Sequence, residues 1–199
     1  MGTFFSSFDE AWAAFLERDE PLEDFFGRFP EEEAYLTFWL ALPGPAVQAE
    51  ATAVQQALAG VQGLRPTPTH WLHVSLGPGR EDGLDGVRER LRDFGSFSAE
   101  YGPATCFHEA LVLEVHSDRM TDLARAIDPE RDLELFLPHV SVAYVAGTPE
   151  PGPSRQKLVQ LRNRPPVPER ISEVQLCVVP VRRSKLLSPW RVAGVVPLD

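Results

Sequence analysis

The hydrophobic and polar positions follow two different periods along the chain. Apolar residues that recur every three or four positions predict helices over residues 8–16, 46–58, 84–94, 118–127 and 154–161. Runs rich in aromatic and β-branched residues predict strands over 35–42, 69–76, 96–101, 105–115, 133–145, 174–181 and 190–196. This mixture of strands and helices predicts an α+β fold.

The first thirty-odd residues differ from the rest of the chain. Ser7 followed by Glu10 fits a capping box ahead of the first helix, and Pro21 is expected to open a second short helix ending near Gly27. Residues 1–33 hold ten acidic and two basic side chains, and seven of the twelve phenylalanines precede residue 30. We expect residues 1–33 to form an acidic, Phe-rich helical arm that packs on a main body over residues 34–199. A lid or a partner-binding segment is the alternative.

A short string occurs twice in the chain. Leu-His-Val-Ser-Leu at residues 72–76 aligns with Pro-His-Val-Ser-Val at 138–142, and the two histidines are 66 positions apart. On a strand, residues i and i+2 share a face, so each histidine lies beside its serine and the apolar neighbours point to the core. The repeat suggests two related lobes. If these lobes face each other, two imidazoles and two hydroxyls meet in one cleft.

Such a set of side chains suits the cleavage of a phosphodiester. One imidazole takes a proton from the attacking hydroxyl or water, and the other protonates the leaving oxygen. Histidine fits both roles because its ordinary pKa is near 6.5. The serine hydroxyls can bond the non-bridging phosphate oxygens, so the chemistry needs neither a metal nor a cofactor. The alternative is that these histidines are hydrogen-bonded structural groups of two strands.

The paired strings resemble the signature of the two-histidine (2H) phosphoesterase superfamily, which includes 2′-5′ RNA ligase-like proteins and cyclic nucleotide phosphodiesterases. That signature is two His-x-Ser/Thr-x motifs with an apolar last residue. Here the motifs are His73-Val74-Ser75-Leu76 and His139-Val140-Ser141-Val142. Pro138 and Ala143, which flank the second motif, are also similar to the family. The resemblance covers residues 34–199.

The resemblance implies a bilobal fold with two antiparallel sheets around a central cleft and helices outside. It also implies a metal-independent phosphoric diester hydrolase that acts on 2′,3′-cyclic phosphates or 2′-5′-linked nucleotides and RNA ends. The expected catalytic residues are His73, Ser75, His139 and Ser141. Cyclic mononucleotides, ADP-ribose cyclic phosphates, 2′-5′ oligonucleotides and RNA ends all stay open as substrates.

One departure from the family pattern lies beside the second motif. Many bacterial members have an arginine five residues past the second histidine, where this chain has Tyr144. We expect Tyr144 to stack on a base or ribose, although strict strand alternation turns it away from His139 unless the strand bulges or ends. Because the expected positive charge is missing, a non-catalytic nucleotide- or RNA-binding module of the same fold is the alternative function.

The net charge and its distribution along the chain limit the kinds of ligand that the protein is expected to bind. A net charge of −10 makes the chain a poor binder of duplex DNA. Residues 153–199, however, hold nine basic and three acidic side chains, and we expect Arg182 and Arg183 to contact a phosphate or RNA end; the alternative is a solvated turn. The predicted ligand is a small nucleotide or a short RNA end.

Other features bear on the cellular setting. Cys106 and Cys177 lie in apolar runs, which fits reduced core thiols in a cytoplasmic protein. No apolar run is long enough to span a membrane, so we expect no membrane partner. The expected state is a monomer. His70 is interpreted as a structural or exposed residue, and His108 and His116 are interpreted as ordinary strand residues.

Overall fold

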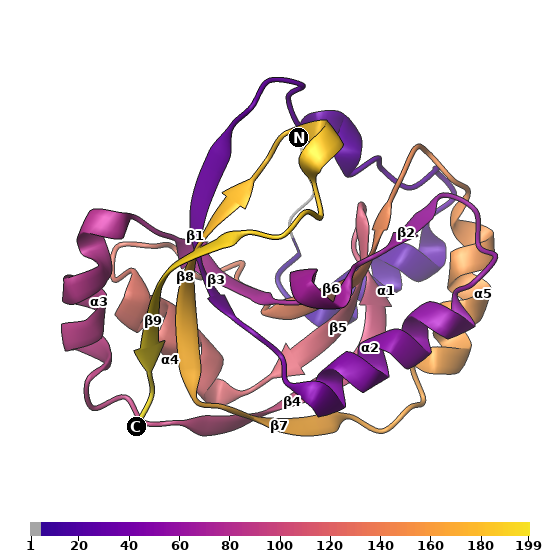
Figure 1. The fold of residues 1–199 in the computed structure, drawn as a ribbon. Helices are drawn as coiled ribbons and strands as arrows, with labels where there is room; N and C mark the ends of the chain where they lie inside the picture. Colours follow the sequence, from indigo (N-terminus) through magenta and orange to yellow (C-terminus); the bar gives the residue numbers. More distant parts are fainter. Residues whose placement is uncertain (1–4) are drawn as a thin grey trace.

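The computed structural model describes residues 5–199, which form two antiparallel sheets with helices packed against them (Figure 1). The strands are β1 (Tyr35–Ala41), β2 (Leu64–Pro66), β3 (Val74–Pro78), β4 (Phe97–Cys106), β5 (Ala110–His116), β6 (His139–Val145), β7 (Val167–Ile171), β8 (Glu173–Pro180) and β9 (Arg191–Pro197). The helices are α1 (Phe8–Glu17), α2 (Pro45–Ala57), α3 (Leu84–Leu91), α4 (Asp118–Ile127) and α5 (Pro151–Leu161). The predicted α+β class with two antiparallel sheets is confirmed. None of the described helices is long and apolar enough to cross a membrane.

The two sheets share one topology. The four-stranded sheet has the order β3-β1-β8-β9, and the five-stranded sheet has the order β2-β6-β5-β4-β7. If β2 is left out, β3, β1, β8 and β9 of the first sheet hold the same places as β6, β5, β4 and β7 of the second. In each lobe, the helix that follows the second of these strands packs against the other lobe: α2 follows β1 and packs against β6 and β7, and α4 follows β5 and packs against β3. In Figure 1, α3 and α4 accordingly lie beside the four-stranded sheet, and α1, α2 and α5 lie beside the other. This arrangement agrees with the pair of related lobes that the repeat suggests.

A β-bulge follows the serine in both copies of the repeat. The register between β5 and β6 shifts after Ser141, which leaves Val142 without a partner on β5. The register between β1 and β3 shifts in the same way at Leu76. Because a bulge adds one residue to its strand, it resets the alternation of side chains. Tyr144 therefore faces the same side as His139, which strict alternation would forbid.

Several helices and strands begin or end at other residues than predicted, because their ends depend on which backbone groups find hydrogen-bond partners. The strand predicted over 69–76 begins only at Val74, since residues 69–71 form a 3-10 turn. The strand predicted over 133–145 begins at His139, and the helix predicted over 84–94 ends at Leu91. The predicted runs 96–101 and 105–115 are instead β4 and β5, with the division at residues 107–109.

The helix predicted at Pro21 is wrong. Residues 21–25 have no helical structure, and the arm makes only a 3-10 turn, η1 (Phe26–Arg28). The backbone of this segment bonds to the main body instead: the Leu22 N–H donates to the Pro149 carbonyl at 2.9 Å, and the Phe25 N–H donates to the Val145 carbonyl at 3.0 Å. The main body thus supplies hydrogen-bond acceptors for these backbone N–H groups, so the segment does not have to form a helix to satisfy them.

The arm is part of the hydrophobic core over its described residues, 5–33. Ser7 caps α1 by accepting the Glu10 N–H at 3.1 Å, as predicted. Phe15 and Leu22, which are 4% and 1% exposed, join the core that both lobes share. Phe25 joins a second cluster of buried residues on the other side of the sheets. The predicted packing of the arm on the main body is therefore present.

Candidate functional site

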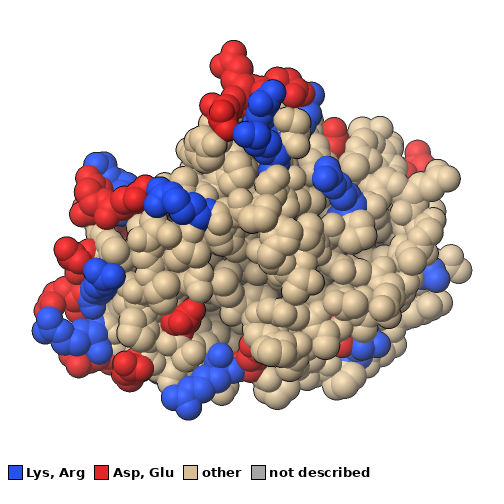
Figure 2. All heavy atoms as spheres, in the orientation of Figure 1, with Lys and Arg blue, Asp and Glu red and all other residues tan. Residues whose placement is uncertain are grey.

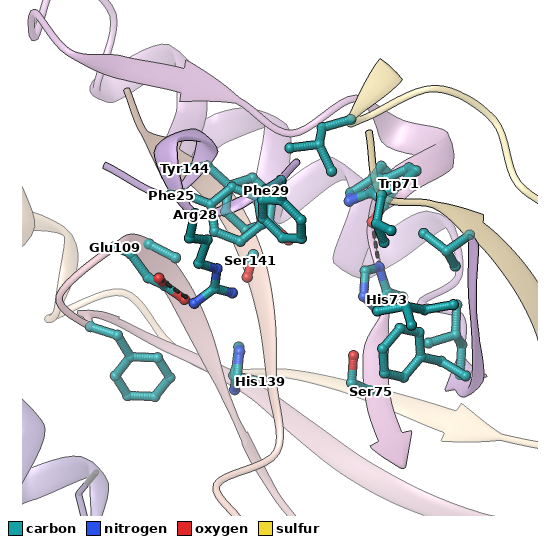
Figure 3. Close-up of a pocket in the computed structure, with 18 residues that line it drawn as sticks. Phe25, Arg28, Phe29, Trp71, His73, Ser75, Glu109, His139, Ser141 and Tyr144 are labelled. Carbon is teal, nitrogen blue, oxygen red and sulfur yellow. Dashed lines mark hydrogen bonds and ion pairs between the residues drawn. The ribbon is translucent and has the colours of Figure 1, made fainter. Parts of the chain in front are cut away.

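A cleft of about 550 Å³ lies between the two sheets (Figure 3). His73 and Ser75 line one wall, and His139 and Ser141 line the opposite wall. The rest of the lining is mainly aromatic and aliphatic: Phe25, Arg28, Phe29, Leu36, Phe38, Leu40, Trp71, Phe107, Glu109, Ala110, Tyr144, Val179, Val181 and Leu186. The fold thus brings together the four residues that the repeat singles out.

Both imidazoles are oriented by the same hydrogen bond. Nδ1 of His73 donates to the Trp71 carbonyl at 2.6 Å, and Nδ1 of His139 donates to the Leu137 carbonyl at 2.7 Å. A carbonyl oxygen can only accept, so Nδ1 carries the hydrogen in each ring. In the neutral imidazole this leaves Nε2 as a proton acceptor. Each copy of the repeat therefore presents an Nε2 lone pair for chemistry.

Aromatic side chains hold the two rings in place. The edge of His73 meets the ring of Trp190, with centroids 5.4 Å apart. The His139 ring meets Phe107 in the same edge-on manner, with centroids 4.9 Å apart and planes at 88°. Such contacts restrict the rotation of an imidazole and keep water from much of its surface. They fix each ring by packing as well as by its hydrogen bond.

Burial makes both histidines less basic. Burial lowers the pKa of His73 to about 4, although the bond to the Trp71 carbonyl acts in the opposite direction. The charge of a protonated His139 would lower the pKa of His73 further. Burial also lowers the pKa of His139 below 6.5. With both pKa values below 6.5, the neutral form of each ring predominates at pH 7, and an anion between the rings would favour the protonated form of either one.

Tyr144 faces the cleft, but the arm covers one side of its ring. The rings of Tyr144 and Phe25 are stacked, with centroids 4.0 Å apart. Burial raises the pKa of the Tyr144 phenol. Tyr144 lines the cleft together with Ser141 and Trp71. Its expected stacking on a base or ribose stays a prediction.

Arg182 and Arg183 are not among the residues that line the cleft. The Arg183 guanidinium donates to the carbonyls of Phe26 and Gly27, at 3.2 and 3.0 Å, and pairs with Glu31 at 2.9 Å. Lys185 pairs with Glu33 at 2.8 Å in the same region. In Figure 2 the visible charged side chains gather mostly at the periphery. These basic C-terminal residues thus bind the acidic arm, since opposite charges attract at short range.

Two charged residues of the cleft were missed by sequence reasoning. Arg28, from the arm, donates through Nη1 to Oε2 of Glu109 at 2.5 Å. Burial raises the pKa of Glu109, and the neighbouring Arg28 acts against that rise. The one available signal was weak: Arg28 is one of only two basic residues in an acidic segment. Nothing local in the sequence places that segment at the cleft.

The described residues contain no group of three or more His, Cys, Asp or Glu side chains arranged to hold a metal ion. The polar side chains in the cleft lining are two imidazoles, two serine hydroxyls, the Tyr144 phenol, the Trp71 indole and the Arg28–Glu109 pair. This set can transfer protons and donate hydrogen bonds to an anion.

No protein-family profile and no curated protein matches the sequence. Solved structures do match the fold. The protein TT0787 of Thermus thermophilus is 18% identical with a TM-score of 0.56, covering 82% of this chain and 97% of its own. E. coli LigT complexed with 3′-AMP is 12% identical with a TM-score of 0.55, covering 84% and 99%. A conserved protein of unknown function from Agrobacterium tumefaciens, ATU0111, is 13% identical with a TM-score of 0.56, covering 94% and 98%.

At sequence identities this low, the similarity between this chain and these structures is a similarity of fold. The chain has the bilobal fold of the 2H phosphoesterases, so the resemblance that the two motifs suggest is confirmed at that level.

Proposed function

We propose that the protein is a metal-independent phosphodiesterase that acts on 2′,3′-cyclic phosphates or 2′-5′ linkages in small nucleotides and short RNA ends. The observation that carries the proposal is the pair of imidazoles on opposite walls of one cleft, each with Nδ1 bonded to a backbone carbonyl. The complex of E. coli LigT with 3′-AMP supports a nucleotide ligand, since that protein has the same fold.

The geometry supports a concerted acid–base reaction on a 2′,3′-cyclic phosphate. One imidazole accepts a proton at Nε2 from water as the water oxygen bonds to phosphorus. The other imidazole, protonated at Nε2, gives its proton to the 2′ or 3′ oxygen as that oxygen leaves phosphorus. The hydroxyls of Ser75 and Ser141 donate to the non-bridging oxygens, where negative charge grows. The single product is a nucleoside 2′- or 3′-monophosphate in which the oxygen that left phosphorus is a free ribose hydroxyl.

The lowered pKa values shape the first step. Because the lowered pKa values favour the neutral form of both imidazoles at pH 7, one of them must gain a proton when the anionic substrate binds. The negative charge of the phosphodiester favours that protonation. Substrate binding and preparation of the general acid are therefore coupled.

We expect kcat/KM to follow a bell-shaped pH curve with its maximum on the acid side of pH 6.5. The acid loses its proton as pH rises above its pKa, and the base gains one as pH falls below its own. Both pKa values are lowered in the free enzyme, which kcat/KM reports. The alkaline limb of kcat should lie at higher pH, because kcat reports the complex. Initial rates at low and saturating substrate measure both curves, and a kcat/KM maximum above pH 6.5 would contradict this prediction.

Direct turnover assays test the function. The full-length protein is incubated with adenosine 2′,3′-cyclic phosphate or a 2′-5′-linked dinucleotide, with and without a metal chelator, and the products are separated by chromatography. We expect cleavage at equal rates in both conditions, because the proton transfers require only the two histidines. Loss of turnover in the chelator would contradict a metal-independent mechanism. Binding of AMP in calorimetry, with no turnover of either substrate, would favour the non-catalytic nucleotide-binding module.

A further inference from the structure

Among the residues that line the cleft, Arg28 is the one Arg or Lys side chain. A bound phosphate carries negative charge, whereas the lowered pKa values favour the neutral form of both imidazoles at pH 7. Tyr144 stands five positions past His139 and has no charge to offer. Among the described residues that line the cleft, Arg28 of the N-terminal arm is therefore the one source of a lasting positive charge.

The arm is fixed to the main body just ahead of Arg28. The Glu23 N–H donates to the His108 carbonyl at 2.9 Å, and the Phe25 N–H donates to the Val145 carbonyl at 3.0 Å. Stacking of Phe25 on Tyr144 adds a side-chain contact at the same place. These bonds and this contact set the path of the backbone as it enters the turn that carries Arg28.

The guanidinium of Arg28 is held over the cleft without being buried. Its carbon lies 4.8 Å from the Phe25 ring centroid and 5.2 Å from that of Phe29. The side chain is 54% exposed. In Figure 3 the guanidinium points into the space between Glu109 and Ser141, with His139 on the far side of that space. The group is thus ordered by its neighbours and still accessible to a ligand.

Glu109 takes up one of the hydrogen-bond donors of this guanidinium. The bond to Glu109 uses Nη1, and within the described residues neither Nη2 nor Nε of Arg28 has a hydrogen-bond partner. A guanidinium presents five donors in a planar fork that matches the oxygens of a phosphate. The unused donors are free to bond an anion, while the carboxylate of Glu109 repels that anion. Arg28 and Glu109 should therefore affect anion binding in opposite directions.

We propose that Arg28, carried by the N-terminal arm, binds the phosphate of the nucleotide in the cleft, and that Glu109 competes for the same guanidinium. The proposal takes a nucleotide phosphate as ligand from the proposed function. It adds that residues 5–33 are part of the substrate site, so the main body of residues 34–199 has an incomplete binding site without them.

Equilibrium binding of 3′-AMP to the full-length protein tests the proposal, with adenosine as the ligand that lacks a phosphate. Arg28→Ala is expected to weaken 3′-AMP binding by about tenfold or more, the usual effect of losing a charge-assisted hydrogen bond. Glu109→Gln is expected to strengthen 3′-AMP binding severalfold, because the guanidinium is released and a negative charge is removed. Neither change should alter adenosine binding. Arg80→Ala is the matched control, because Arg80 also pairs with a carboxylate, Asp82, outside the cleft.

A purely structural role for the ion pair gives a different pattern. Both Arg28→Ala and Glu109→Gln would then weaken binding, and they would do so equally for 3′-AMP and adenosine; that result would overturn the proposal. Failure of the wild-type protein to bind 3′-AMP would overturn it as well. Arg28-dependent binding of 3′-AMP without turnover of any phosphodiester would instead sink the proposed function and leave this inference standing. Turnover with unchanged kcat and KM in Arg28→Ala would do the reverse.

Discussion

Replacing His139 with alanine is expected to lower the turnover of a 2′,3′-cyclic nucleotide by about 10²–10⁴-fold, and His73→Ala by a similar factor, because each change removes one proton transfer. The two histidines act in one step, so the double variant should be little slower than either single variant. Initial rates at saturating substrate measure the loss.

Two controls separate chemistry from folding. His139→Asn can keep a hydrogen bond to the Leu137 carbonyl but has no group that titrates near neutral pH, so we expect the same loss of turnover as in the alanine variant. His70→Ala is the matched control, since His70 lies three positions before His73, bonds the Leu187 carbonyl and is outside the cleft lining. Its turnover should stay close to wild type. A histidine variant with wild-type turnover would remove that histidine from the mechanism.

Leu22→Ala is expected to lower the free energy of unfolding by about 2–5 kcal/mol, the usual cost of cutting a buried leucine to alanine. Leu22 is 1% exposed and belongs to the core shared by both lobes, although it comes from the arm. Urea unfolding measures the change. The expected loss is large because a cavity opens where the arm joins the main body.

Leu16→Ala is the matched control for this experiment. Leu16 is on the same arm, in α1, and is 38% exposed. We expect its change in the free energy of unfolding to stay within about 0.5 kcal/mol, since an exposed leucine loses little contact and alanine is a good helix former. Equal effects of the two variants would mean that the arm is a separate unit, and would weaken the case that it helps to form the cleft.

The elements that the sequence predicted well are those with a long and regular pattern. The helix over 118–127 is observed with its predicted Ser117 cap, and the strand over 35–42 is observed as β1. β2 and β7 were not predicted, because one is only three residues long and the other contains two charged residues among five. Both strands exist because a neighbouring strand offers backbone hydrogen bonds, and such a neighbour is not visible in a local pattern.

The charge pattern along the chain likewise does not reveal which distant segments meet in the fold. The acidic first segment and the basic last segment were both evident in the sequence, and the basic one was interpreted as a phosphate contact. In the structure, Arg183 and Lys185 pair with Glu31 and Glu33 of the arm instead. Two segments of opposite charge neutralise each other when the fold brings them together. Their distance along the chain gave no sign of that contact.

The repeated His-Val-Ser string was enough to predict that His73, Ser75, His139 and Ser141 lie in one cleft, because strand alternation places each imidazole beside its hydroxyl and the repeat suggests two facing lobes. The side on which Tyr144 lies, and the arrival of Arg28 at the cleft, depend on the tertiary structure. The first follows from a bulge that forms only when β6 pairs with β5, and the second from backbone bonds between the arm and residues more than eighty positions away. Pairing between distant segments has no local period, so hydrophobic patterning does not reveal it.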